Sequence, residues 1–226
     1  MSAAIPAAAH AAPAPTAGAW IGVGVAARGV LTVAFGVVPV VVVAGVTMVV
    51  TYADEMARSD PDIGSLGPEA NRLLGVLMEF VDALRPVATA FAVAATAIGV
   101  ALFAAGVMLA RGSETGRRFA RGLLLVDALR AVASSVAMAV LFATTLSGWL
   151  DRYQEAVAAI VAAAPGAGRS PMFRFHVPAE LNIASDALGC VFGLAVAGLL
   201  FWAAGRPSAR RWCAARSANY PVASGR

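Results

Sequence analysis

The sequence predicts an all-α integral membrane protein with four transmembrane helices and both termini in the cytoplasm. Of its 226 residues, 60% are hydrophobic and only 13% are charged, whereas roughly 25% are charged in a soluble globular domain. Four apolar runs are each long enough to cross a bilayer. Two of them flank a short turn, residues 111–121, which holds four Arg as cytoplasmic loops often do. We therefore expect a four-helix bundle in a membrane.

The first transmembrane span is expected at residues 29–52, which contain no charged residue. A helix of this length is about 36 Å long, enough to cross a hydrocarbon core of roughly 30 Å. Pro39 lies inside this run and predicts a kink. Residues 1–28 begin with an Ala- and Pro-rich stretch and are predicted to be a disordered tail. No basic region precedes the apolar run, so an uncleaved span is favoured over a signal peptide.

The segment between the first two spans is acidic, with seven Asp and Glu against three Arg in residues 53–85. In its second half, apolar residues recur on one helix face: Leu73, Leu77, Phe80 and Leu84. This spacing predicts a short amphipathic helix in the first outer loop. Such a helix caps the bundle, lies on the membrane surface or extends the second span, and we favour the cap.

The second span is expected at residues 87–110, and three of its small residues share one helix face: Ala95, Gly99 and Gly106. Small side chains let the backbones of two membrane helices approach closely. We therefore predict that Gly99 and Gly106 belong to a helix-packing face.

The third span is expected at residues 122–149 and contains two charges, Asp127 and Arg130. A charge in hydrocarbon costs at least about 2.5 kcal/mol, so both residues are candidate intramembrane functional groups. Residues 131–149 alone are about 28 Å long and nearly span the core. We therefore favour an ion pair at the cytoplasmic headgroup level, three residues apart on one helix face. A buried proton or ion relay is the alternative.

The fourth span is expected at residues 181–203, which completes a transmembrane domain of residues 29–204. A basic cytoplasmic tail follows at residues 205–226. Small residues recur every four positions in this span and predict a second helix-packing face: Gly189, Gly193 and Ala197. Asp186 lies near the outer end, where we favour a hydrated or hydrogen-bonded carboxylate over a proton-binding one.

The distribution of Arg orients the chain. Ten Arg lie before the first span, in the central turn and in the tail, against six in the two other loops. Because basic residues accumulate on the cytoplasmic side, both termini and the central turn are predicted to be cytoplasmic. All seventeen basic residues are Arg, which together with abundant Ala, Gly and Val indicates a GC-rich genome. The expected location is a bacterial cytoplasmic membrane, with the chain as a multi-pass protein.

No nucleotide-binding loop, zinc-ligand spacing, nucleophile elbow or pair of catalytic carboxylates is recognisable in the sequence. We expect no cofactor, no metal and no nucleic acid partner, and an enzyme is not favoured. The two cysteines, Cys190 and Cys213, predict no disulfide framework, since one falls in a span and the other in the cytoplasmic tail.

Three functions stay open at this point. The first is a non-catalytic accessory or assembly subunit of an envelope complex, which contacts the lipid bilayer and another membrane subunit or a second copy. The second is a small transporter or channel that uses Asp127, Arg130 and Asp186. The third is an envelope sensor whose acidic outer loop meets ions or a partner and whose Arg-rich tail meets anionic lipid. We favour the first, because small-residue packing faces are present and recognisable site chemistry is not.

Overall fold

The computed structural model describes residues 16–59, 68–163 and 179–219, and these ranges are almost entirely helical. The elements in chain order are α1 (Thr16–Ser59), α2 (Pro68–Ala110), α3 (Glu114–Leu141), the π-helical η1 (Phe142–Leu146), α4 (Ser147–Ala163), α5 (Ala179–Gly205) and α6 (Pro207–Asn219). No strand occurs in the described ranges. The predicted all-α class is therefore confirmed.

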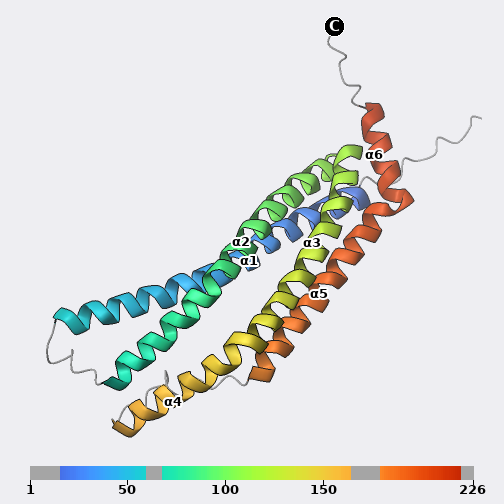
Figure 1. Ribbon diagram of the computed structural model, residues 1–226. Coiled ribbons are helices and arrows are strands. Elements are labelled where there is room, and N and C mark those ends of the chain that lie inside the picture. The colour runs from blue at the N-terminus through green and yellow to red at the C-terminus, as the bar shows by residue number, and fades with distance from the viewer. Residues whose placement is uncertain (1–15, 60–67, 164–178, 220–226) are drawn as a thin grey trace, which may run out of the picture.

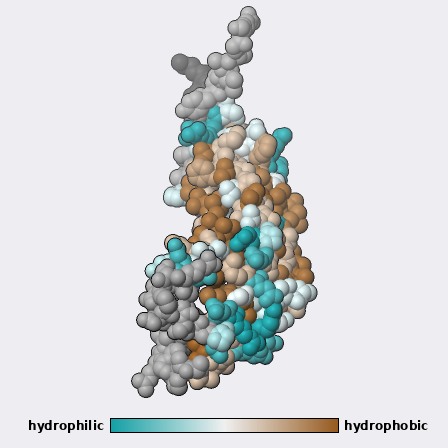
Figure 2. Space-filling view, turned by 60° about the vertical axis from the view of Figure 1, so that its left-hand side comes forward, coloured by the Kyte–Doolittle hydropathy of each residue, from teal (hydrophilic) through white to brown (hydrophobic). Residues whose placement is uncertain are grey.

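Four segments are long and apolar enough to cross a membrane: Gly18–Glu55, Pro68–Ala110, Glu114–Thr145 and Ala187–Gly205. This confirms the prediction of four helices of transmembrane length. Figure 2 shows apolar side chains gathered in a broad region on the upper half of one face of the molecule, with hydrophilic side chains above it and over much of the lower half. Such a region is expected of a surface that faces hydrocarbon.

The helices run up and down, so that α1 pairs with α2 and α5 lies beside α3 (Figure 1). The start of α1, the turn between α2 and α3, and α6 gather at one end. Trp212 of α6 packs against Gly18 of α1 and donates its Nε1–H to the carbonyl of Leu109 at 3.3 Å. This end of the molecule is therefore held by contacts among three helices.

The start of α1 differs from the prediction, because the helix begins at Thr16 and not near residue 29. Residues 16–28, which were assigned to a disordered tail, are therefore helical. A Cβ built at Gly22 would meet the backbone of Gly106 and Ala110, and Val25 is fully buried. Packing against α2 thus stabilises a Gly-rich segment whose intrinsic helix propensity is low.

The amphipathic segment predicted for the first outer loop extends the second span, which was the third alternative and not the favoured cap, because α2 is one helix from Pro68 through Pro86 to Ala110. Its apolar stripe packs on α4. The indole Nε1–H of Trp149 donates to the carbonyl of Val76 at 2.6 Å, and the Trp149 ring lies 4.5 Å from that of Phe80. A proline inside a helix is tolerated when neighbouring helices supply contacts around it.

The central turn is shorter than its charge pattern indicated, because α3 begins at Glu114. Gly112 has a φ of 87°, which an L side chain rarely adopts. Ser113 then caps α3, since its Oγ accepts the backbone N–H of Gly116 at 3.1 Å. At the other end, the helical path continues through η1 into α4 and so passes beyond the predicted end at residue 149.

The closest helix contact joins α1 to α2 through glycines spaced by seven residues: Gly22, Gly29 and Gly36. A Cβ built at Gly29 would lie 2.5 Å from the carbonyl oxygen of Gly99, and one built at Gly99 would lie 2.6 Å from that of Gly29. One built at Gly106 would lie 2.7 Å from the carbonyl oxygen of Gly22. Gly99 and Gly106 therefore lie in a seam where only hydrogen fits.

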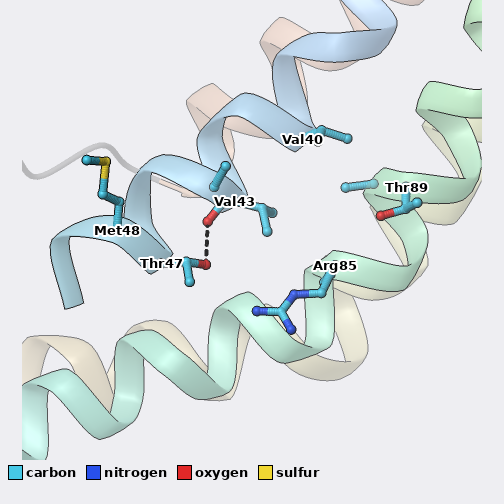
Figure 3. Close-up of a pocket in the computed structure, with 8 residues that line it drawn as sticks. Val40, Val43, Thr47, Met48, Arg85 and Thr89 are labelled. Carbon is cyan, nitrogen blue, oxygen red and sulfur yellow. Dashed lines mark hydrogen bonds between the residues drawn. The ribbon is translucent and has the colours of Figure 1, made fainter. Parts of the chain in front are cut away.

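Beyond this glycine seam, the next position in the same register is Val43, which packs with Leu84 and Ala88 of α2. A side chain now separates the two helices, and α1 and α2 diverge toward their loop end (Figure 1). An open groove of about 400 Å³ lies here, with Thr47 on one wall and Arg85 on the other (Figure 3). The change from Gly to Val along one face accounts for the groove.

Candidate functional site

A buried charge cluster joins α1 to α3, and Asp127 of α3 is its centre. The Asp127 side chain has no exposed surface. Its Oδ2 accepts Arg28 Nε–H of α1 at 2.9 Å and lies 2.8 Å from Arg28 Nη2. Its Oδ1 accepts Nε–H and Nη2–H of Arg130 at 3.1 and 2.9 Å. Both carboxylate oxygens are thus bound by charged donors, which form shorter and stronger hydrogen bonds than neutral donors do.

Thr32 completes the cluster on the α1 side. Its Oγ1 lies 3.4 Å from each carboxylate oxygen of Asp127, and the residue is only 3% exposed. Thr32 follows Arg28 by four residues, so both side chains leave the same face of α1. That face meets α3 because the glycine seam holds the adjoining face of α1 against α2.

A third helix contributes space to the cluster. Gly193 of α5 is buried, and a Cβ built there would lie 3.4 Å from Nη2 of Arg28. The missing side chain leaves room for the guanidinium group between α1, α3 and α5. Gly193 therefore lies against a charged side chain and not against another helix backbone.

The cluster carries two guanidinium groups and one carboxylate, a net charge of +1. The side chains of Arg28 and Arg130 are 12% and 17% exposed. Removing such charges from water costs several kcal/mol per ion, and only mutual pairing with good hydrogen bonds offsets that cost. Because the Arg28–Asp127 pair joins α1 to α3, that part of the offset depends on the tertiary structure.

The cluster lies inside two of the membrane-length segments, Gly18–Glu55 and Glu114–Thr145. Trp20 is 71% exposed near the start of α1, and Arg121 lies near the start of α3. Arg28 is about 12 Å along α1 from Trp20, and Asp127 is about 9 Å along α3 from Arg121.

The ion pair between Asp127 and Arg130, three residues apart, is present as expected. Its position at the headgroup level stays a prediction, and the structure adds that Asp127 is enclosed by helices with no exposed surface. The helical path around the pair extends from Glu114 to Ala163 without a break.

The structure separates the remaining candidates. Nothing lies within 4 Å of a Cβ built at Gly189, whereas Ala197 is buried in the core at 2% exposure. Asp186 belongs to α5, about 10 Å along the helix from Gly193, and its side chain lies outside the described residues. Within the described part of the chain, the three small residues of α5 therefore do not form one close helix contact. Packing of a second copy on this face and a role for Asp186 stay predictions.

Sequence reasoning missed Arg28, Thr32 and the bond between α1 and α3. Arg28 was counted as a positive charge outside the membrane, because the residues before it were assigned to a tail. An available signal was the apolar stretch of residues 18–27, which places Arg28 inside a long helix. A buried Asp in another span then requires a cation, and Arg28 is the cation in the first span.

Within the described ranges, no three His, Cys, Asp or Glu residues come together to hold a metal ion. No protein-family model matches the sequence, and comparison with curated proteins and with solved structures finds no similar protein.

Proposed function

We propose that this chain is a non-catalytic accessory or assembly subunit of an envelope complex. The observation that carries the proposal is the saturation of Asp127 by Arg28 and Arg130. A carboxylate that takes up a proton or an ion in transport needs a free oxygen or a mobile partner. Asp127 has donors on both oxygens and joins α1 to α3, which is a structural use of a buried charge.

The surface of α1 supports the same proposal. Its outer half carries large apolar side chains that none of the described helices covers: Phe35 (72% exposed), Val41 (61%) and Met48 (75%). In a membrane this surface contacts lipid, another subunit or a second copy of the chain. An exposed apolar face of this kind suits a subunit that docks in the plane of the membrane.

The proposed setting is the bacterial cytoplasmic membrane with both termini in the cytoplasm. The excess of Arg in the central turn and the tail supports this orientation. The gathering of the α1 start, the central turn and α6 at one end is consistent with it (Figure 1).

Purification in mild detergent tests the proposal. We expect a stoichiometric membrane partner or a defined homo-oligomer to co-purify, and Asp127→Asn to release it as the bundle loosens. Asp151→Asn, an exposed carboxylate of α4, is the matched control and should leave assembly unchanged. A well-folded monomer with no partner in several mild detergents would contradict the proposal.

A small transporter or channel that uses Asp127, Arg130 and Asp186 is the second candidate, because the cluster carries a net positive charge inside the bundle. Reconstitution in vesicles separates the two functions. Flux of protons or ions that Asp186→Asn abolishes, in a variant of normal stability, would replace the accessory function by transport.

A further inference from the structure

A second charged site lies at the end of the molecule where α3 begins and α6 follows α5. A hollow of about 560 Å³ opens there, lined by Glu114, Arg117, Arg118, Arg210, Ala214 and Ser217. It lies between α3 and α6, and we call it the α3–α6 groove. The membrane-length segments Pro68–Ala110, Glu114–Thr145 and Ala187–Gly205 all have an end near it. The groove is therefore at the level where apolar spans give way to polar surroundings.

The groove carries an excess of positive charge, with three Arg and one Glu in its lining. Glu114 is already paired, with Arg117 Nη2 at 2.6 Å and Arg118 Nε at 3.1 Å. Arg117 also donates from Nη1 to the carbonyl of Ala204 at 3.1 Å, so it forms part of the wall. Arg210 is exposed and pairs with no acid in the described part of the chain. The site therefore has a cation available for an external anion.

The position of Arg210 is defined by packing of α6. Cys213 and Ala209 on the buried face of α6 are 1% and 0% exposed. Trp212 is held by its hydrogen bond to Leu109. Four residues before Arg210, Arg206 stacks over the Trp202 ring at 3.6 Å, and Trp residues are enriched at the headgroup level of membranes.

We propose that the α3–α6 groove binds the phosphate of an anionic phospholipid headgroup, with Arg118 and Arg210 as the contacting cations. Arg118 is 77% exposed and keeps donors free beyond its bond to Glu114. The guanidinium group suits phosphate because it offers two parallel N–H donors to two oxygens. A soluble phosphate has the same chemistry. At the ends of three membrane-length segments, however, lipid headgroups supply phosphate at high local concentration, so we assign the anion to a lipid.

Lipid retention by the full chain tests this proposal. The protein, purified in mild detergent, is incubated with phosphatidylglycerol or phosphatidylcholine, and bound lipid is counted by native mass spectrometry. We expect phosphatidylglycerol to be retained in preference to phosphatidylcholine. Arg210→Gln should lower that retention about fivefold, since a basic residue near a membrane surface contributes ~1 kcal/mol toward anionic lipid.

The matched control is Arg211→Gln, because Arg211 is also exposed on α6 but does not line the groove. Its phosphatidylglycerol retention should stay within twofold of the unchanged protein. An equal loss of phosphatidylglycerol retention in the two variants would mean that diffuse surface charge binds the lipid, and would overturn the proposal of a site in the α3–α6 groove. Arg118→Gln provides a second variant on a different helix, and full retention in both groove variants would also overturn the proposal.

Inorganic phosphate distinguishes the two sources of the anion. It should displace bound phosphatidylglycerol only weakly, because it lacks the acyl chains that keep the headgroup at this level. The opposite result is binding of inorganic phosphate at millimolar concentration with no preference for phosphatidylglycerol. It would mean that the site binds a soluble anion, and it would contradict the proposal of a lipid.

Discussion

Asp127 lies between two guanidinium groups and a threonine hydroxyl, without any exposed surface. Removing one partner of such a buried pair costs about 3–5 kcal/mol, because the remaining charge stays buried without compensation. The members of the cluster are therefore expected to respond to substitution as a group and not independently.

Asp127→Asn should destabilise the protein by about 3–5 kcal/mol, since it raises the net charge of the cluster from +1 to +2. Adding Arg28→Gln returns that charge to +1, so the double variant should be less destabilised than the sum of the two single variants. Thermal unfolding in detergent measures all three, with Asp151→Asn as the control. Strict additivity would mean that Arg28 and Asp127 do not interact.

Cys213 is buried on α6, and burial raises the pKa of its thiol above the ordinary value. Folding therefore favours the neutral thiol. That contribution to stability is present below the ordinary thiol pKa and is lost as the pH rises through the raised pKa.

In a Cys190→Ser background, we expect Cys213 to react with N-ethylmaleimide at pH 7 at least tenfold more slowly in the folded protein than in denaturant. The rate of alkylation, followed by mass, checks this. Fast labelling of the folded protein would place α6 away from the bundle.

At the scale of the helices, α1 and α2 meet through glycines because in lipid there is no hydrophobic driving force between apolar helices, and close packing must replace it. The backbone of Gly99 lies where a side chain on Gly29 would go. A methyl group there must push the helices apart.

Gly29→Ala should destabilise the protein by about 1–3 kcal/mol, which is the usual cost of overpacking a core. Gly45→Ala is the matched control on the same helix, because nothing lies within 4 Å of a Cβ built at Gly45. It should be neutral or slightly stabilising, as Ala favours helix more than Gly does. A melting experiment that ranked the two variants the other way would rule out the glycine seam.

The α5 helix allows a similar comparison next to the charge cluster. Gly193→Leu should destabilise the protein, because the new side chain would occupy the space of the Arg28 guanidinium. Gly189→Leu, four residues away and open, is the control and should be tolerated. The penalty at position 193 should shrink in an Arg28→Gln background, whereas a penalty unchanged by Arg28 would show ordinary helix packing.

At the scale of the molecule, polar contacts tie α1 and α2 to the rest of the bundle at three levels. Trp212 bonds to Leu109 at the α6 end, Arg28 pairs with Asp127 farther along, and α2 meets α4 near the opposite end. There Arg72 pairs with Glu155 and Arg152 with Glu79, at 3.0 and 2.7 Å. These outer pairs are exposed and contribute about 0–1 kcal/mol each, so the buried pair dominates.

The orientation in the membrane is tested with single cysteines in a chain without Cys190 and Cys213. Thr115→Cys, exposed in the first turn of α3 and beside the Ser113 cap, should be protected from an impermeant thiol reagent in intact cells. Ser65→Cys, which lies outside the described residues, should be labelled. The reverse pattern would invert the topology.

The sequence alone determined the fold class and the four membrane-length helices, because long uncharged runs have one stable state in hydrocarbon, in which each helix satisfies its own backbone. It also indicated the small-residue face with Gly99 and Gly106, since a period of 3.6 residues places residues on one face whatever the neighbours are.

Only the tertiary structure decided where α1 begins, that α2 continues through Pro86, and that Asp127 is bound by Arg28. Each of these depends on a partner distant in the chain: α2 stabilises the start of α1, Trp149 covers the early part of α2, and Arg28 compensates a carboxylate 99 residues away. Local composition predicted a tail for residues 1–28, because composition does not depend on partners that are distant in the chain. Whether Asp127 is hydrated or buried was likewise set by which helices surround it, a property of packing and not of position along the chain.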